Sequence, residues 1–462
     1  MGEVIPVRWF LTHKRPDIDE EVARCLAILF GEKHFSGITP GTELRECGIP
    51  NLDGKAAEKT GVIMLGIGQH RFDEHTGADM PGRPGECAAT LMARFLGILD
   101  MPALQRLFAL VKANDLHGQG SPFDIGTLPK TMYEFMDGKD VVSWMDTAVR
   151  AVIHAESSGK PFDPQEGLYM FDRTVAAWLY NTFGEKETTG GKVLDGDELV
   201  KYVFGSKQLV ATDMAKTLSV EEDKALQFIL KYLRAPANGE SMFDLKGLPA
   251  LIYAMDPQDP MKAINWLFAG LNAKFQDQTT FLEAVEKFKA DVVAGKIEIK
   301  EVRTSRGRKI KIAIINNCTN RQMNKAGRYC GMDMVIQRQL PGHVQIFTNK
   351  ASRLDLSELA AMIRIEEQKA TGQSVTWNWN QLRLEGTVPG VTNWFYHREG
   401  QMLLNGTPKL DQPATKILLS KILWLVEIAL GQGDVSCEGS CNKSCAWHAW
   451  GLDRCHQRRH QR

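Results

Sequence analysis

Residues 4–31, VIPVRWFLTHKRPDIDEEVARCLAILFG, decide the fold that we expect for this chain. Residues 4–12 form a β-type run that ends at His13. Residues 18–30 then place apolar side chains at helical spacing, and Gly31 is positioned to end that helix. The order strand, short polar loop, helix is typical of the start of an α/β domain.

The same alternation continues after this opening unit. Residues 61–66 (GVIMLG) read as a short buried strand, and residues 86–99 and 101–113 read as helices. Strands that alternate with helices predict a mostly parallel sheet, whose ligands lie beyond the carboxyl ends of the strands.

The chain is too long, at 462 residues, for one ordinary core, so we expect two or three domains. Helical patterns dominate the middle of the chain, and strand patterns return after it with a basic hairpin. No internal repeat of fixed period is visible. We predict an α/β protein with an N-terminal parallel-sheet domain (1–124), a helical middle region (125–294), a smaller C-terminal α/β domain (295–432) and a Cys/His-rich tail (433–462).

Charge and apolar content are those of an ordinary globular protein. Lys and Arg number 56, as do Asp and Glu, and this balance argues against a protein that mainly coats nucleic acid or an anionic membrane. The longest apolar stretch, residues 417–430, is interrupted by Lys421 and Glu427, and the N-terminus lacks the apolar core of a signal peptide. We therefore expect a cytoplasmic protein without membrane contact, and its scattered cysteines (Cys25, Cys47, Cys87, Cys318, Cys330) are expected to be reduced.

The loop THKRPDID (12–19) is the first candidate site. A strand ends at His13 and a helix starts near Asp19, so His13, Asp17 and Asp19 can converge on one point. One imidazole with two carboxylates suits Mn²⁺ or a similar borderline cation. The alternative interpretation is that one of the aspartates only caps the helix, although a cap needs one carboxylate and no histidine.

Two further segments place ionisable side chains where an element ends. The stretch QHRFDEHT (69–76) follows the second strand, and KANDLHG (112–118) ends a helix with Asp115, a position that the helix dipole disfavours. The first of them is equally compatible with a solvated charged turn when taken alone. Beside the loop 12–19 in a βαβ arrangement, both strand ends lie at one edge of the sheet.

The chain resembles the DHH phosphoesterase superfamily in the order of three features. These are H-x-x-x-D-x-D, then a strand followed by HRFDEH, then a helix that ends in an aspartate. The HRFDEH phrase and the small-residue helix after it are most similar to the MYG branch, named for the melanocyte proliferating gene product, whose members are described as exonucleases acting on RNA. The resemblance covers residues 1–120 and, more thinly, 330–430.

This resemblance implies a role for each matching residue. His13 and Asp17 would bind one metal, and Asp19 and Asp115 would bind a second. His75 falls on the final histidine of the family's triplet, close to the substrate phosphate, and Asp73 falls on its aspartate; with Arg71, His75 would steady negative charge that develops on phosphate. In the C-terminal domain, WFYHREGQMLLNG resembles the segment that closes the family's site, and it supplies His397 and Asn405 as candidates to bind phosphate or base.

The chain departs from the family pattern at two positions. The family places a metal-bridging aspartate at the end of the second strand, where this chain has Gly66. The middle residue of the triplet, a metal-binding histidine in the family, is Glu74, whose longer side chain can ligate Mn²⁺ or Mg²⁺ and reach the place of the missing bridge.

Two weaker signals lie toward the C-terminus. The turn SRGRK carries Arg306 and Arg308, which read either as a solubilising edge hairpin, the interpretation we favour, or as contacts to a nucleic-acid backbone. The tail places soft ligands at a spacing that is unusual for a zinc knuckle, so a Zn²⁺ module is the minor alternative to an unstructured, redox-prone tail. These tail ligands are Cys437, Cys441, Cys445 and His448.

Together these features predict an exonuclease-like, metal-dependent phosphoesterase with one or two Mn²⁺ or Mg²⁺ ions, acting on the phosphodiester bonds of short RNA, DNA or nucleotides. The alternative is a protein of the same fold that binds nucleotides or oligonucleotides without hydrolysis, and Gly66 is the residue that favours it. The sequence leaves the oligomeric state open.

Overall fold

The computed structural model describes residues 4–47, 52–74, 83, 85–160, 162–163, 168–179, 181–182, 219–304, 307–374, 378–397, 401–406 and 413–431. The chain divides into two compact units, Met1–Thr279 (unit 1) and Thr280–Arg462 (unit 2). Several predicted features lie outside the described residues: the C-terminal tail with Cys437, Cys441, Cys445 and His448, the side chains of His75 and Arg306, and a helix expected within 197–203.

Among the described residues, unit 1 contains a parallel sheet with the strand order β4 (Leu44–Cys47), β2 (Trp9–His13) and β5 (Val62–Met64). A second parallel pair joins β1 (Ile5–Pro6) to β3 (Phe35–Ser36). The predicted mixed α/β fold with a parallel sheet in the N-terminal region is thus confirmed. β2 runs directly into α1 (Ile18–Phe30), and α2 (Gly54–Glu58) precedes β5.

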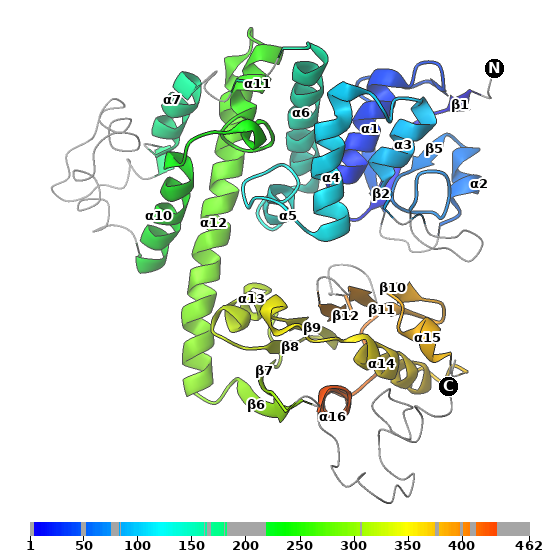
Figure 1. Ribbon diagram of the computed structural model, residues 1–462, viewed down its shortest axis with the longest axis vertical. Helices are drawn as coiled ribbons and strands as arrows, with labels where there is room; N and C mark the ends of the chain where they lie inside the picture. Colours follow the sequence, from blue (N-terminus) through cyan, green and yellow to red (C-terminus); the bar gives the residue numbers. More distant parts are fainter. Residues whose placement is uncertain are drawn as a thin grey trace, which may run out of the picture. The chain divides into compact units, whose positions relative to one another are not determined.

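Helices make up most of the rest of unit 1 (Figure 1). α1 packs against α3 on one side and α6 on the other. The helices that follow β5 are α3 (Ala88–Leu96), the short η1 (Pro102–Leu104), α4 (Gln105–His117), α5 (Leu128–Met132), α6 (Gly138–Ser157), α7 (Leu168–Leu179), α10 (Val220–Arg234), η3 (Gly239–Phe243), α11 (Leu248–Met255) and α12 (Pro260–Val293).

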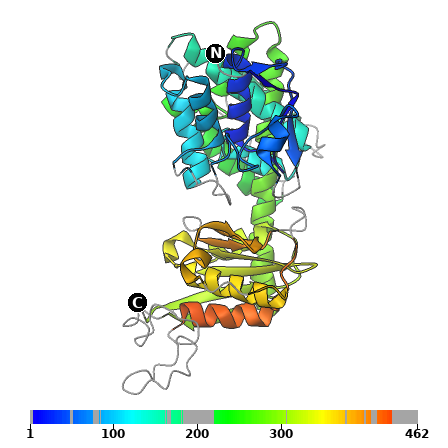
Figure 2. The same ribbon diagram turned by 90° about the vertical axis from the view of Figure 1, so that its right-hand side faces the viewer.

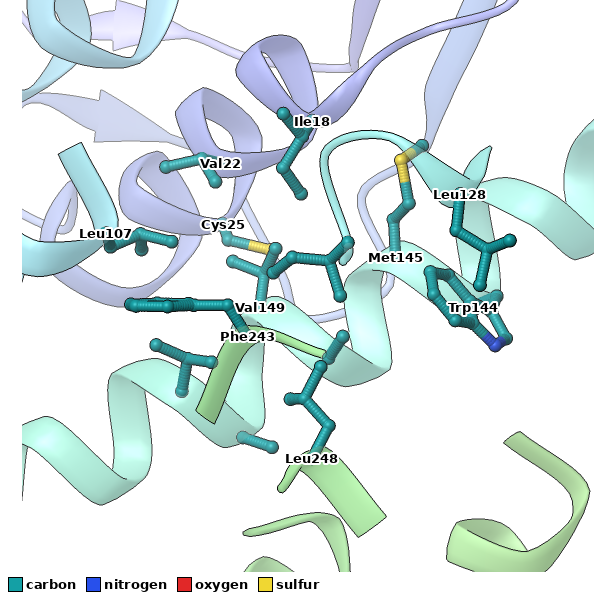
Figure 3. Close-up of a cluster of buried hydrophobic side chains, with 14 of the residues drawn as sticks. Ile18, Val22, Cys25, Leu107, Leu128, Trp144, Met145, Val149, Phe243 and Leu248 are labelled. Carbon is teal, nitrogen blue, oxygen red and sulfur yellow. The ribbon is translucent and has the colours of Figure 1, made fainter. Parts of the chain in front are cut away.

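One hydrophobic core runs through the whole of unit 1. α1 is buried on nearly every face between residues 18 and 27, so it can pack on the α3 side and on α6 at once. Figure 3 shows side chains of α1 meeting those of α6 and of the segment that leads into α11: Ile18, Val22, Cys25, Met145, Val149, Phe243 and Leu248. The region 125–279, which the sequence separates from residues 1–124 by pattern, therefore shares their core, and the division between units falls within α12.

Among the described residues, unit 2 contains a seven-stranded sheet with the order β10-β11-β12-β9-β8-β7-β6. Neighbouring strands are antiparallel except β7 and β8, which are parallel and are joined through helix α13. The strands are β6 (Glu298–Arg303), β7 (Lys309–Ile315), β8 (Met334–Gln339), β9 (His343–Thr348), β10 (Gly386–Val388), β11 (Val391–His397) and β12 (Met402–Leu404).

Helices cover both faces of this sheet. Alternate residues of β7 face different cores: Ile312 packs with α14 and α16, whereas Ala313 packs with α13 and the end of α12. Figure 2 shows α14 and α16 together on one face. The helices of unit 2 are α13 (Gln322–Tyr329), η4 (Lys350–Ser352), α14 (Ser357–Ala370), α15 (Trp379–Leu382) and α16 (Leu419–Leu430).

Most predicted elements are present with shifted ends. The basic hairpin is confirmed as β6 and β7, with β6 at one edge of the described sheet. The stretch 417–430 forms the helix α16, as its interrupted apolar pattern indicated. In the part of the chain that the structure describes, no helix is both long enough and apolar enough to cross a membrane.

Candidate metal centre

The candidate site lies at the carboxyl edge of the parallel sheet in unit 1. β2 and β5 are neighbours, so His13 at the end of β2 and Gly66 just after β5 come to the same edge. Backbone hydrogen bonds fix this arrangement: Leu65 donates to the carbonyl of Leu11 at 2.9 Å, and Gly66 donates to the carbonyl of Phe72 at 2.9 Å. The N-terminus of α1 opens at this edge.

A reciprocal cap shapes the first turn of α1. The Asp17 carboxylate accepts a hydrogen bond from the backbone N–H of Asp19 at 2.9 Å, and the Glu20 carboxylate accepts one from the backbone N–H of Asp17 at 2.9 Å. The alternative interpretation of Asp17 as a helix cap is therefore correct as a local description. The same cap also turns the Glu20 carboxylate toward His13, because His13 Nε2 lies 2.8 Å from Glu20 Oε1.

His13, Asp17 and Glu20 form what we call the first cluster: each offers a ligand atom, and these atoms all lie within 4.8 Å of one another. The Glu20 carboxylate raises the pKa of His13 to about 10 against the opposing effect of burial. Burial by itself would raise the pKa of Glu20, but the His13 pairing and the hydrogen bonds with Asp17 lower it to about 2. One imidazole and two carboxylates are thus held close together, and the charges of His13 and Glu20 shift each other's pKa.

Asp19, Cys87 and Asp115 form the second cluster, with ligand atoms again within 4.8 Å of one another. Asp19 is 2% exposed, and its two carboxylate oxygens accept hydrogen bonds from the backbone N–H groups of Ala88 and Ala89 at 2.8 Å each. These are the first residues of α3, so that helix N-terminus orients the Asp19 carboxylate.

Asp19 also connects the two clusters electrostatically. Burial raises its pKa well above the usual range, and the nearby carboxylates of Glu20, Asp115, Asp17 and Glu74 raise it further, in that order. Carboxylates from α1, from the last turn of α4 and from the loop after β5 therefore share one buried region. Of the three residues expected to converge on one point, His13 and Asp17 lie together in the first cluster, whereas Asp19 lies in the second.

Sequence reasoning missed Glu20 as well as Cys87, and Glu20 fills a particular space in the site. A Cβ atom added to Gly66 would lie 2.8 Å from Glu20 Oε1, so the Glu20 carboxylate fills the space that a side chain at position 66 would enter. We expected Glu74 to reach the place of the missing carboxylate, and the structure places Glu20 there instead. The available signal was the spacing Asp17-x-x-Glu20, which predicts a capping box and so directs the glutamate back toward the loop.

Two further predicted residues of unit 1, Asp73 and Arg71, hold the loop after β5. The Asp73 carboxylate accepts a hydrogen bond from the backbone N–H of Gln69 at 2.7 Å, which closes this loop. Arg71 makes a two-point ion pair with Glu58 of α2, at 2.8 Å for each contact, and stacks over Phe95. Arg71 is thus directed to α2 rather than to either cluster.

The predicted phosphate-binding residues of unit 2 have structural partners. Asn405 is fully buried; its amide donates to the carbonyl of Asn393 at 2.8 Å and accepts from the backbone N–H of Thr415 at 2.7 Å. The expectation that Asn405 binds substrate is not supported, because its amide holds the backbone of the interior. His397 pairs with Glu385 at 3.0 Å, and Arg308 pairs with Asp333.

A third group of ligand-type side chains, Glu21, Cys25 and Asp146, lies on the other side of α1. Arg24 pairs with both carboxylates of this group, and Arg150 pairs with Asp146 at 2.7 Å. Two guanidinium groups thus already balance the charge, which makes this group a structural ion-pair network joining α1 to α6.

No protein-family model, no curated protein and no solved structure matches this chain. The chemistry of the site is therefore argued from its own residues. Imidazole and carboxylate ligands in the first cluster suit a borderline divalent cation such as Mn²⁺, and the thiol of the second cluster adds a softer ligand atom. Such a centre can neutralise and orient a phosphate ester.

Proposed function

We propose that this chain is a metal-dependent phosphoesterase of the DHH type that hydrolyses phosphodiester bonds in short RNA, DNA or nucleotides, in the manner of an exonuclease. The observation that carries the proposal is the meeting of two clusters, His13-Asp17-Glu20 and Asp19-Cys87-Asp115, at the carboxyl edge of a parallel sheet. In open α/β sheets this edge is the usual place for ligands.

The concentration of buried carboxylates favours a cation as the natural occupant. Burial and mutual repulsion raise the pKa of both Asp17 and Asp19. A divalent cation among these ligands would remove that repulsion, whereas an anionic ligand alone would be repelled. When bound, such a cation supplies Lewis acidity and neutralises charge on the phosphoryl oxygens.

Different residues of the chain would then hold the cation and orient the ligands. The His13 imidazole and the Asp17 and Glu20 carboxylates hold one ligand position, and the reciprocal cap at the start of α1 keeps the two carboxylates in place. Asp19 is oriented by the α3 N-terminus, and Asp115 reaches the same region from α4. We propose Glu20 as the substitute for the bridging aspartate that position 66 lacks.

The second candidate is a protein of this fold that binds nucleotides or oligonucleotides and does not hydrolyse them. Gly66 favours it, because the residue that bridges two metals in the DHH family is absent from that position. The Glu20 carboxylate in the same space weakens the argument.

Mn²⁺-dependent hydrolysis of labelled RNA and DNA oligonucleotides and of cyclic dinucleotides, wild type beside Asp17→Asn, tests the proposal. Asparagine caps helices as well as aspartate does, so this variant removes a ligand charge without removing the cap. Asp137→Asn is the matched control, since Asp137 caps α6 in the same way and belongs to neither cluster. We expect turnover in wild type and in Asp137→Asn and its loss in Asp17→Asn. Metal binding with no cleavage of any substrate by wild type would favour the binding protein.

A further inference from the structure

Unit 1 contains an internal duplication that is visible once its loops are paired. Residues 121–130, SPFDIGTLPK, match residues 241–250, SMFDLKGLPA, with Ser, Phe, Asp, Leu and Pro identical at five aligned positions. Each copy leads into a helix with proline in its first turn, α5 in the first copy and α11 in the second. The repeat is short and recurs once, so it does not appear in the sequence as a fixed period.

The two copies pair with each other in a reciprocal way. Ile125 donates its backbone N–H to the carbonyl of Phe243 at 2.9 Å, and Leu245 donates to the carbonyl of Phe123 at 3.3 Å. The helices that follow repeat this reciprocity. Trp144 and Trp266 stack at 4.4 Å between ring centroids, and each indole donates to the other residue's carbonyl, at 2.8 and 2.9 Å. The copies are therefore related by an approximate two-fold exchange.

The two copies can be compared position by position, because residues that they share support the structure that they have in common. The Asp124 and Asp244 carboxylates are shared, and both accept backbone hydrogen bonds from the residues that follow them in their loops. The differences are informative for the same reason. Apart from the pairs Ile/Leu and Pro/Met, the copies differ where the first has Gly126, Thr127 and Lys130 and the second has Lys246, Gly247 and Ala250.

All three differing residues of the first copy contact Asn114. A Cβ atom on Gly126 would lie 2.9 Å from the Asn114 side chain, so the glycine leaves room for it. The Asn114 amide donates to the Thr127 hydroxyl at 3.3 Å, and Lys130 Nζ donates to Asn114 Oδ1 at 2.9 Å. The residues that differ between the copies thus surround Asn114, and Asn114 holds Lys130. Asn114 is the sequence neighbour of Asp115 in the second cluster.

Lys130 is exposed, and its ammonium group is held by Asn114, the sequence neighbour of Asp115, at the last turn of α4. The helix α5 that carries Lys130 is tied to the loop 14–17, because the Tyr133 hydroxyl just beyond it donates to the carbonyl of Pro16 at 2.7 Å. An exposed ammonium group is therefore fixed by Asn114 on a helix that is hydrogen-bonded to the loop of the first cluster.

We propose that Lys130, held by Asn114, binds the phosphate group of the substrate at the edge of the metal centre. Three residues of the first copy differ from the second copy, and all three contact the Asn114 side chain that holds Lys130. Packing of the repeat does not require a lysine at this position, since Ala250 occupies it in the second copy. A lysine ammonium is a common point-charge ligand of phosphate. This inference rests on the proposed function, because it names the substrate contact of that site.

Calorimetric titrations of the full chain with Mn²⁺, and then with inorganic phosphate in saturating Mn²⁺, test the inference. We expect Lys130→Ala to bind phosphate about tenfold more weakly than wild type, the usual effect of losing one charge-assisted contact. Lys130→Arg should recover part of the affinity, and Mn²⁺ binding should be retained in both variants. The matched control is Lys139→Ala, which removes an exposed lysine charge at the start of α6 and should leave phosphate binding unchanged.

The outcomes separate this inference from the proposed function. Equal phosphate affinity in wild type and Lys130→Ala, with Mn²⁺ bound by both, overturns the role of Lys130 and leaves the metal centre standing. Absence of phosphate binding by Mn²⁺-loaded wild type also overturns it. Absence of Mn²⁺ binding by wild type overturns the proposed function itself. A loss of Mn²⁺ affinity in Lys130→Ala, with unchanged phosphate affinity, would make Lys130 a structural counter-charge.

Discussion

Asp115→Asn changes one carboxylate of the second cluster to a neutral group of nearly the same shape. Asp115 stands in the last turn of α4, where the helix dipole disfavours a negative charge, and its ligand atom lies within 4.8 Å of that of Asp19. Without a cation, the substitution should therefore stabilise unit 1. With a cation, it should remove a ligand.

The magnitude follows from the geometry. At a pH where Asp19, whose pKa is raised, and Asp115 are both ionised, two unit charges about 5 Å apart repel by roughly 3 kcal/mol at an effective dielectric constant of about 20. Asp115 is only half-buried, so solvent screening reduces this to about 1 kcal/mol, and the dipole adds about 0.5 kcal/mol. Mn²⁺ at one hundred times its dissociation constant stabilises the wild type by about 2.7 kcal/mol, whereas a variant that binds a hundredfold more weakly gains about 0.4 kcal/mol.

Thermal unfolding in an Mn²⁺ titration measures both effects. For a unit of this size, about 1 kcal/mol corresponds to roughly 2–4 °C in Tm. We expect Asp115→Asn to unfold a few degrees above wild type without metal, and to lose most of the wild-type rise of roughly 5–10 °C with Mn²⁺. Asp100→Asn, the same change at an exposed position, should behave as wild type. An equal Mn²⁺-induced rise in Asp115→Asn and wild type would refute the reasoning.

Three further predictions concern single positions in unit 1. The double variant Glu20→Ala/Gly66→Asp should recover part of the Mn²⁺ affinity that Glu20→Ala loses, because the new carboxylate enters the vacated space; equal loss in both variants, measured by calorimetry, would argue against substitution of one carboxylate by the other. Trp144→Ala should lower the free energy of urea unfolding by about 3–5 kcal/mol, because it removes a buried indole that stacks on Trp266 and donates to its carbonyl, whereas Trp424→Ala at an exposed site should cost under about 1 kcal/mol. Burial raises the pKa of Asp244 to about 6, above its unfolded value, so its contribution to stability is complete below about pH 4 and is lost as pH rises through 6. Relative to Asp244→Asn, the free energy of unfolding of the wild type should fall by roughly 2 kcal/mol between pH 4 and 7. Parallel pH profiles of the two proteins would contradict this.

Local signals in the sequence were sufficient for the start of the domain. The predicted helix 18–30 coincides with α1, because Asp17 and Glu20 make a capping box at one end and Gly31 ends the helix at the other. The apolar pattern of residues 280–294 predicts a helix, and the structure shows it as the second half of α12, which begins at Pro260. Gly270 lies inside this continuous helix, where a Cβ atom would lie 2.7 Å from Leu245, so the glycine allows close packing.

Four of the six ligand-type residues of the two clusters were predictable from the sequence, and Glu20 and Cys87 were not. His13, Asp17, Asp19 and Asp115 could be found because each follows a strand or ends a helix at one sheet edge. The role of Glu20 depends on empty space above Gly66, which only the packing of α1 against the loop after β5 defines. For Asn405 the motif predicts substrate binding, but the side chain is fully buried and hydrogen-bonded to the backbone, which the sequence does not reveal.

The central claim is that the two clusters hold divalent cations, and anomalous diffraction from crystals of the full chain grown with Mn²⁺ tests it most directly. We expect anomalous density among His13, Asp17 and Glu20, and among Asp19, Cys87 and Asp115 if a second ion binds. Density absent from both clusters at saturating Mn²⁺, or confined to the group of Glu21, Cys25 and Asp146, would contradict it.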